Sequence, residues 1–411
     1  MTQSLTDDQK RGLDIMLKGD NCFLTGSPGC GKTYLLNIFI QKMKGSNILI
    51  TASTGIAASH INGSTFHSVN KLGLGKEDLK ILSAQMKRNR KVSKMWRECR
   101  CVIIEEISML DPDYFDKMSS VIGEVRGDSR PFGGVQVILC GDFLQLPPIG
   151  TSKMIFETTS WQNLKLKNII LTTTVRQNDK DFIGVLSKLR FGIVDDESML
   201  YLEQRVRRNE ETLKLYPLRK DVDSENLRML EKIESPERIY EARFTSTCSD
   251  NTINSKNYES LVKDMVARRT LTLKVGAKVL YLANNPNQGL VNGSRGEVVG
   301  FDGKYPIVKF RNSSLTVTYH SWERKTSDGI FTFSQLPLLC CYGISIHKSQ
   351  GMSLDEAEID LGKNIFECGM AYVALSRIKT IEGVYISSLD RKSFIANKKS
   401  IKFYEDLKSD I

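Results

Sequence analysis

The feature that most constrains this chain is a glycine-rich segment near its beginning, GSPGCGKT, which runs from Gly26 to Thr33. An apolar run at residues 22–24 precedes this segment, and an apolar-periodic stretch at residues 34–43 follows it. This order predicts a strand, a loop and a helix. Two glycines followed by lysine and threonine at this spacing are typical of a loop that holds nucleotide phosphates. The segment therefore predicts a parallel α/β fold that binds a nucleoside triphosphate.

The side chains of the loop suit that ligand. Its glycines let backbone N–H groups converge on a phosphate without interference from Cβ atoms. Lys32 can neutralise the β- and γ-phosphate oxygens, the Thr33 hydroxyl can ligate Mg²⁺, and the helix N-terminus favours negative charge. A glycine turn that happens to precede a lysine is the alternative, but it leaves the flanking strand and helix unexplained. The expected nucleotide-binding residues in the loop are Gly26, Ser27, Gly29, Cys30, Gly31, Lys32 and Thr33.

Length and composition bound the remaining possibilities. A chain of 411 residues predicts two or three domains. The formal net charge of +10 favours an anionic partner such as nucleic acid, although a solvated basic face would give the same excess. No apolar run reaches the roughly 18 residues that cross a bilayer, and no targeting pattern is visible at the start. The nine cysteines lack zinc spacing, so we expect reduced thiols and an intracellular location. Because no apolar run is long enough to cross a bilayer, we expect no membrane partner.

Short apolar runs alternate with helical patterns from residue 20 to about residue 175. The runs are apolar throughout, as in a parallel sheet that is covered on both faces, which predicts a doubly wound lobe. The expected strands are Cys22–Thr25, Ile48–Thr51, Cys101–Ile104, Val135–Cys140 and Asn168–Thr172. Residues 67–100 interrupt the lobe as a basic and mostly helical insertion. A second α/β region begins near Arg176 and resumes after Leu336.

Residues of about 270–335 have a different pattern, with short strands between turns at Asn292-Gly293 and Asp302-Gly303. This pattern predicts a small antiparallel barrel inserted into the second α/β region. The expected strands are Leu271–Leu282, Glu297–Phe301, Pro306–Phe310, Leu315–Tyr319 and Ile330–Phe333.

Two acidic side chains end a second apolar strand, in the sequence from Cys101 to Glu106. Beside a phosphate loop, the first carboxylate, Glu105, would hold Mg²⁺ through water, and the second, Glu106, would polarise the attacking water. A solvated strand end is the alternative. Gln145 follows another strand and can sense the γ-phosphate, although a capped turn before Pro147 and Pro148 is equally compatible with that segment.

Two arginines, Arg176 and Arg377, are candidates for stabilising charge on the transferring phosphoryl group from a second lobe. Without that context each would be taken for a surface ion pair. Two donor-rich segments can grip a nucleic-acid strand through phosphate contacts and base stacking. One lies at residues 51–55 and 63–68, and the other at residues 345–351. The expected strand-binding residues in these segments are Thr51, Ser53, Thr65, Phe66, His67, His347, Lys348, Ser349 and Gln350.

These motifs, in this order, resemble the Pif family (petite-integration-frequency helicases) of the superfamily-one DNA helicases. The resemblance runs from about Leu5 to about Ser388. Its most specific part is Glu106–Asp111 followed by Arg130–Gln136, which looks like the family's own signature. Residues 290–296, 347–351 and 372–377 also match in order and spacing.

The resemblance implies two RecA-like lobes, at residues 1–174 and at residues 175–269 with 336–411. It also implies a wedge at residues 67–100 and the β-barrel accessory domain at residues 270–335. It implies ATP and Mg²⁺ as cofactors, with Gln9 reading the adenine, Gly351 near the nucleotide, and Arg176 and Arg377 acting as fingers. It also adds Pro148 to the residues expected to hold single-stranded DNA. The partners would be single-stranded and forked DNA, unwound 5′ to 3′ by a monomer in replication, repair or recombination.

Two residues depart from the family pattern. Glu105 stands where aspartate is usual, which can reposition the Mg²⁺-bound water, and Val175 stands where an aromatic residue commonly precedes the finger arginine. Three alternatives remain open at this point. The chain could be a nucleotide-gated switch or binding ATPase without unwinding activity, a nucleic-acid-binding module whose ATPase is weakened by Glu105, or an RNA helicase.

Overall fold

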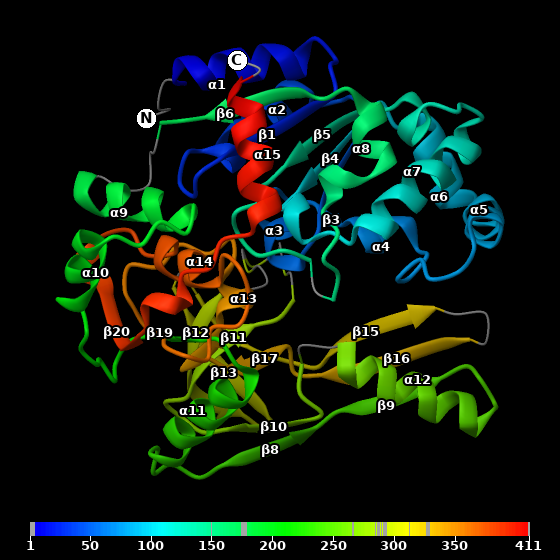
Figure 1. The fold of residues 1–411 in the computed structure, drawn as a ribbon. Coiled ribbons are helices and arrows are strands. Elements are labelled where there is room, and N and C mark those ends of the chain that lie inside the picture. Colours follow the sequence, from blue (N-terminus) through cyan, green and yellow to red (C-terminus); the bar gives the residue numbers. More distant parts are fainter. Residues whose placement is uncertain are drawn as a thin grey trace. The chain divides into compact units, whose positions relative to one another are not determined.

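The computed structural model describes residues 5–148, 150–173, 179–264, 267–283, 285, 288, 290, 294–311, 313–325 and 329–409. The chain divides into two compact units (Figure 1). The first unit consists of residues 1–210 and 346–411, and the second consists of residues 211–345.

The first unit is built on a six-stranded sheet whose strand order is β3-β2-β4-β5-β1-β6. All of its neighbouring strands are parallel. The five strands expected from the apolar runs are present to within one residue at each end, and the two-residue strand β3 was not expected. The strands are β1 Cys22–Gly26, β2 Ile48–Ala52, β3 Ser64–Thr65, β4 Cys101–Glu105, β5 Gln136–Cys140 and β6 Lys167–Leu171. The expected parallel α/β fold is confirmed.

Both faces of this sheet are buried, which explains why its strands are continuously apolar. Alternate side chains of β1 join different hydrophobic clusters: Cys22 and Leu24 pack with helices α1 and α2, whereas Phe23 packs with α7 and α8. The covering helices are α1 Asp7–Leu17, α2 Lys32–Lys42, α7 Pro112–Arg126 and α8 Thr159–Leu164. The carboxyl ends of the strands are thereby fixed at one edge, where the phosphate loop begins.

The basic segment expected to be helical contains short helices. They are α4 Phe66–Asn70, α5 Leu79–Arg88 and α6 Arg90–Glu98, and another short helix, α3 Gly55–His60, precedes the segment. A buried hydrogen bond joins two helices of the segment, because Trp96 Nε1 in α6 donates to Asn70 Oδ1 in α4 at 3.0 Å. Asn70 Nδ2 in turn donates to the carbonyl of Phe66 at 2.9 Å. Trp96 and Phe66 are fully buried and belong to the same hydrophobic cluster as the sheet and α7, so these helices are anchored to the core of the lobe.

The remainder of the first unit contains helices and a parallel strand pair, β19 with β20. Its elements are α9 Lys180–Arg190, α10 Asp196–Glu203, α13 Ile346–Ser349, β19 Ala357–Leu361, α14 Met370–Ser376, β20 Val384–Leu389 and α15 Lys398–Ser409. The last helix, α15, packs on the first sheet. Phe403 stacks on Phe156 with centroids 4.3 Å apart, and Tyr404 and Leu407 enter the core cluster of the sheet. Short 3₁₀ turns lie at Ile107–Met109, Pro131–Gly134, Ile155–Glu157, Ile381–Gly383 and Arg391–Ser393.

The second unit combines a parallel strand pair, β7 with β18, and three antiparallel sheets. The antiparallel sheets have the strand orders β14-β13-β12-β11-β17, β15-β16-β9 and β10-β8. The elements before the longest sheet are β7 Lys214–Tyr216, α11 Arg219–Glu231, β8 Arg238–Glu241, β9 Arg243–Ser246, α12 Asn251–Asp264 and β10 Thr270–Leu273. The others are β11 Lys278–Tyr281, β12 Arg295–Asp302, β13 Tyr305–Phe310, β14 Ser314–Thr316, β15 His320–Lys325, β16 Ile330–Gln335, β17 Leu338–Cys340 and β18 Gly343–Ser345.

The antiparallel pairing expected from the sequence is present, but its elements differ in detail. The single strand expected at residues 271–282 is divided into β10 and β11 by a turn at Gly276, whose φ is +91°. The turn at Gly303 lies where it was expected, between β12 and β13, whereas Asn292 and Gly293 lie outside the described residues. Strands β8, β9 and β17 also pair in these sheets, although they lie outside residues 270–335. Within the described part of the chain, no helix is long and apolar enough to cross a bilayer.

Candidate active site

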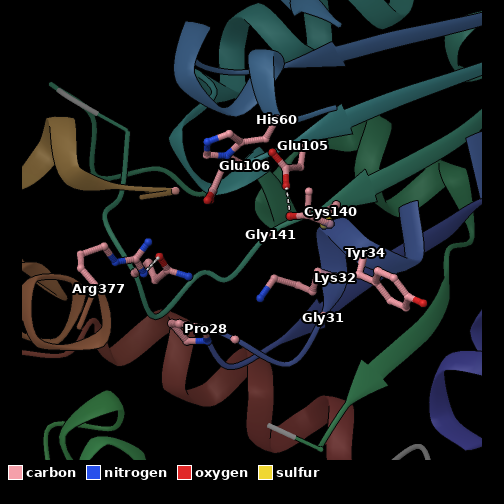
Figure 2. A pocket seen from close by; sticks show the side chains of 14 residues that line it. Pro28, Gly31, Lys32, Tyr34, His60, Glu105, Glu106, Cys140, Gly141 and Arg377 are labelled. Atoms are coloured by element: carbon pink, nitrogen blue, oxygen red, sulfur yellow. Dashed lines mark hydrogen bonds between the residues drawn. The ribbon is translucent and has the colours of Figure 1, made fainter. Parts of the chain in front are cut away.

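A pocket of about 300 Å³ opens at the carboxyl ends of β1, β4 and β5 (Figure 2). The side chains of Lys32, Glu106 and Arg377 point into it from three separate segments of the first unit. The residues that line the pocket are Pro28, Gly29, Gly31, Lys32, Thr33, Tyr34, His60, Glu105, Glu106, Cys140, Gly141, Gln145, Gly351 and Arg377. Several residues expected to bind or hydrolyse a nucleotide therefore meet in one place.

The phosphate loop has a backbone that only glycine adopts without strain at two of its positions. Gly26 has a φ of +148°, and a Cβ there would lie 2.4 Å from the carbonyl oxygen of Leu171. Gly31 has a φ of +86°, and a Cβ there would lie 2.6 Å from Nε2 of Gln9. Gln9 itself donates from Nε2 to the carbonyl of Cys30 at 3.3 Å. The glycines thus bring the backbone of the loop close to β6 and to the first helix.

Lys32 begins helix α2 and is held at the pocket by the loop. Its ammonium group donates to the carbonyl oxygens of Gly26, at 2.8 Å, and Ser27, at 3.1 Å. Burial by itself would lower the pKa of Lys32, but the nearby Cys30, Asp142, Cys140 and Glu106 together raise it. The side chain therefore presents a positive charge at the place where phosphate oxygens are expected.

The two carboxylates at the end of β4 have different surroundings. Glu105 is buried and accepts a hydrogen bond from Oγ1 of Thr33 at 2.7 Å. Burial, followed by the charge of Glu106, raises the pKa of Glu105 to about 8, and Thr33 and Lys32 oppose that shift only in part. Glu106 turns out of the strand with a φ of +52°, in the left-handed region that functional sites often use.

Gln350 contacts the second of these carboxylates. Its Nε2 donates to Oε2 of Glu106 at 3.1 Å, whereas its buried Oε1 has no hydrogen-bond partner among the described residues. Gly351, the next residue, lines the pocket. Gln350, expected to hold a nucleic-acid strand, thus contacts a residue that lines the pocket.

Arg377 and Gln145 contact each other beside the pocket. Nη2 of Arg377 donates to Oε1 of Gln145 at 3.3 Å, and Nε of Arg377 donates to the carbonyl of Val373 at 3.0 Å. Arg377 is only 2% exposed, so its guanidinium is fixed by its surroundings. The other expected finger, Arg176, lies outside the described residues, as does Val175.

Five of the ten expected strand-binding residues are buried, and Gln350, which contacts Glu106, is one of them. The Thr51 hydroxyl donates to the carbonyl of Ile103 at 2.6 Å, and Ser349 donates to the carbonyl of Ile346 at 2.7 Å. Pro148 is buried as well. Phe66 is 0% exposed and packs edge-on against Trp96 and Tyr114. The interpretation of Phe66 as a base-stacking residue is therefore corrected: its ring belongs to the core.

The other expected strand-binding residues are more accessible. His67 stacks on Tyr114 with centroids 4.1 Å apart, and burial lowers the pKa of His67. His347 is half-buried and lies parallel to the exposed ring of Phe366 at 6.1 Å, and burial lowers its pKa too. Lys348 is also half-buried.

Two short side chains of the first expected strand-binding segment make hydrogen bonds to nearby backbone groups. Thr65 caps helix α4 by accepting from the N–H of Ser68 at 3.2 Å. Ser53 donates to the carbonyl of Glu106 at 2.7 Å, which links this segment to the end of β4.

The sequence did not single out several residues of the site. Pro28, Tyr34, His60, Cys140 and Gly141 line the pocket. Ligands of parallel sheets bind at the carboxyl ends of the strands. This rule would have identified Cys140, which ends β5, and Gly141, which follows it. Nothing local marks His60, since a histidine that ends a short helix is usually structural.

A buried ion pair that the sequence did not reveal lies near Lys32 and Gln145. Asp142 does not line the pocket; its carboxylate accepts from Nη2 of Arg190 at 2.8 Å and from Nε at 3.2 Å. Burial would raise the pKa of Asp142, but Arg190 and Lys32 lower it below its ordinary value.

Comparison with known proteins gives consistent matches. The profile described as PIF1-like helicase matches residues 4–199, and the profile of the 2B domain of DNA helicase Pif1 matches residues 257–301. The Xenopus laevis protein named ATP-dependent DNA helicase PIF1 is 37% identical over 99% of this chain. The chain spans 65% of the length of that protein.

Solved structures agree over the full chain. The crystal structure of Pif1 helicase from Candida albicans has a TM-score of 0.91 at 34% identity, with 100% of both chains covered. The Bacteroides Pif1 helicase in complex with ADP-AlF3 and ssDNA has a TM-score of 0.80 at 26% identity, over 99% of this chain and 98% of that one. The fold is thus the Pif1 helicase fold, with parallel sheets in its RecA-like lobes and antiparallel sheets in its 2B domain. The chain belongs to the PIF1-like helicase family.

Proposed function

We propose that this protein is an ATP-dependent DNA helicase that moves 5′ to 3′ along single-stranded DNA and unwinds duplex or structured DNA in genome maintenance. One observation carries the proposal: a single pocket combines the phosphate loop, the paired carboxylates Glu105 and Glu106, and the buried Arg377 that contacts Gln145. The Xenopus relative is named an ATP-dependent DNA helicase, and the Bacteroides relative was crystallised with ADP-AlF3 and ssDNA, which supports both ligands.

The residues of the pocket suit ATP with Mg²⁺. The Thr33 hydroxyl and the Glu105 carboxylate lie 2.7 Å apart, and this pair of oxygen donors is of the kind that Mg²⁺ prefers. Thr33 and Glu105 would hold the ion, which would neutralise charge on the phosphates. Lys32 would bind the β- and γ-phosphate oxygens, and the backbone N–H groups of the loop would surround them.

The other side chains have distinct roles in the proposal. Glu106 would polarise the attacking water, and the unpartnered Oε1 of Gln350 would accept a hydrogen bond from the same water. Arg377 would stabilise charge on the transferring phosphoryl group, with Arg176 as a second finger, and Gln145 would sense the γ-phosphate. Gln9, which lies against the loop at Cys30, would read the adenine.

Single-stranded DNA would be gripped by the accessible members of the expected set: Ser53, Thr65, His67, His347 and Lys348. The net charge of +10 favours a polyanion. We also propose that the helices within residues 67–100 form the wedge that meets a DNA fork, and that residues 270–335 correspond to a small barrel-like accessory domain. The lobes would be residues 1–174 and residues 175–269 with 336–411, in an intracellular enzyme that acts as a monomer.

ATP hydrolysis with and without single-stranded DNA tests the site. We expect Lys32→Ala to abolish DNA-stimulated hydrolysis, because no other side chain of the loop can neutralise the phosphates. Lys18→Ala, which removes an exposed lysine at the end of helix α1, is the matched control and should retain full activity. Undiminished turnover in Lys32→Ala would refute the assignment of the pocket.

Strand displacement on 5′-tailed and 3′-tailed duplexes tests motor function and polarity together. Unwinding of the 5′-tailed substrate alone is expected. Hydrolysis stimulated by DNA, without displacement on either substrate, would point to a binding ATPase that does not unwind. Displacement that requires an RNA tail would make the protein an RNA helicase.

A further inference from the structure

A buried tyrosine on the last helix connects both sides of the nucleotide pocket. Tyr404, in α15, is 4% exposed. Its hydroxyl lies 2.6 Å from Oγ1 of Thr25, accepts from the N–H of Phe143 at 3.2 Å, and donates to Oδ1 of Asp142 at 3.2 Å. Because a tyrosine hydroxyl has one proton, which goes to Asp142, Thr25 must be the donor in the third contact. The hydroxyl is therefore fully satisfied and joins three segments.

The carboxylate at the centre of this network is fixed from the other side by Arg190 at the end of α9. The guanidinium forms two hydrogen bonds to Asp142 and lies 4.9 Å from the centre of the Tyr404 ring. Asp142 is 0% exposed and the Arg190 side chain 12%. A buried charge needs a partner, and Asp142 has Arg190 as its counter-charge. The Tyr404 hydroxyl adds a directional hydrogen bond to the same carboxylate, so both side chains define its geometry.

The residues that this network fixes lie next to the reacting groups. Thr25 immediately precedes Gly26, the first residue of the phosphate loop. Asp142 and Phe143 begin the loop that carries Gln145, whose Oε1 accepts from Arg377. The Tyr404 hydroxyl thus joins the start of the phosphate loop to the loop that presents Gln145.

We propose that Tyr404 is a positioning residue for ATP hydrolysis: through Thr25, Phe143 and Asp142 it sets the distance between the phosphate loop and the Gln145–Arg377 pair. This inference rests on the proposed function of the pocket. It gives α15 a part in the ATPase reaction although Tyr404 does not line the pocket.

Packing alone does not explain the tyrosine. The docking of α15 is already supplied by apolar contacts, with Phe403 stacked on Phe156 and Leu407 buried in the same cluster. A phenylalanine at position 404 would retain the ring and its contact with Arg190. What the hydroxyl adds is a set of directional bonds to two catalytic loops, and those bonds can be removed without disturbing the core.

Tyr404→Phe tests the proposal. We expect kcat for DNA-stimulated ATP hydrolysis to fall about 3- to 10-fold, the range that the loss of a buried hydrogen bond gives. KM for ATP should change less than about 2-fold, because Lys32 and the loop N–H groups remain. Tyr201→Phe is the matched control: it removes a hydroxyl that donates to Asp179 at 3.2 Å, away from the pocket, and should leave kcat unchanged.

Thr25→Val removes the same link from the opposite side and should lower kcat similarly. If both hydroxyls act through one network, the double variant should lose no more than the larger single loss, whereas independent effects would multiply. Melting temperatures measured in parallel report folding. Unchanged kcat in Tyr404→Phe, or a lower melting temperature as its only effect, would overturn the proposal. If the wild type hydrolyses no more ATP than Lys32→Ala, the proposed function itself fails, and the role of Tyr404 fails with it.

Discussion

Asp142 illustrates at the residue scale how a buried charge depends on the groups that surround it. Burial would raise the pKa of Asp142, but the charge of Arg190 and the hydrogen bonds that the Arg190 guanidinium donates lower it. A carboxyl with a folded pKa below its unfolded value stabilises the protein above the unfolded pKa, here 3.8, and loses that stabilisation as the pH falls through the folded pKa. The ion pair is therefore expected to stabilise the fold at neutral pH and to fail in acid.

Asp142→Asn tests this expectation. At neutral pH the substitution leaves Arg190 buried without a counter-charge, so the free energy of unfolding should fall by about 3–5 kcal/mol. The difference from the wild type should narrow in acid, as the pH falls below the unfolded pKa of 3.8 and through the lower folded pKa. Urea unfolding at neutral and at acidic pH measures this difference in the free energy of unfolding. Asp14→Asn, on the exposed side of α1, is the control. An equal difference at both pH values would contradict the assigned ionisation.

At this scale, the sequence reveals residues whose chemistry is tied to a local motif. Lys32 and Thr33 follow from the spacing of the glycines, and Glu105 follows from its place at a strand end. Arg190 and Tyr404 could not be predicted, because they lie 48 and 262 residues from Asp142, and no local pattern marks a buried pairing over such separations. Phe66 was misjudged because an aromatic residue beside hydroxyls and a histidine has the same local pattern whether it is exposed or buried.

At the element scale, helix α7 shows how a single cap fixes a long helix. Asp111 precedes the helix, and its carboxylate accepts from the N–H of Tyr114 at 2.7 Å, with Pro112 in the first turn. Tyr114 in turn packs on Phe66 and on His67. The cap therefore sets the start of a helix that supports Phe66 and His67, in a segment proposed to grip single-stranded DNA.

Asp111→Ala should lower the free energy of unfolding by about 1 kcal/mol, the usual cost of losing an aspartate cap. Asp78→Ala is the matched comparison, because Asp78 precedes helix α5 in the same position but makes no side-chain cap hydrogen bond. It should cost distinctly less. Chemical denaturation of both variants measures the difference, and equal losses would show that the hydrogen bond of Asp111 does not stabilise α7.

Elements of the parallel sheet could be predicted almost to the residue, since burial on both faces leaves continuous apolar runs such as Cys101–Ile104. The antiparallel strands were less readable. Their burial alternates, as in β13 and β16, so single apolar residues carry the signal, and a turn such as the one at Gly276 interrupts an otherwise uniform run. Strand β17 has only three residues, too few to show any period.

At the scale of the whole molecule, charge is the property that bears on a nucleic-acid partner. The chain has 58 lysines and arginines against 48 aspartates and glutamates. Several of these charges are already paired within the protein, as in the contact of Lys214 with Glu225 at 2.7 Å. Net charge therefore gives only the direction of the expected attraction, and the residues that contact phosphates must be identified by substitution.

Single-stranded DNA affinity should fall with salt in a way that counts those contacts. Each phosphate neutralised by the protein contributes about 0.7 to the slope of log affinity against log salt, so about four contacts would weaken binding roughly 50-fold from about 50 to 200 mM. Fluorescence anisotropy with a labelled oligonucleotide measures the slope. Lys348→Ala should reduce it by about 0.7 if the α13 segment grips the strand, whereas Lys18→Ala should not change it. Each released counterion has to be matched by a neutralised phosphate, so a salt response that is flat in the wild type would contradict DNA binding. An unchanged slope in Lys348→Ala would show that Lys348 in α13 does not contact a phosphate.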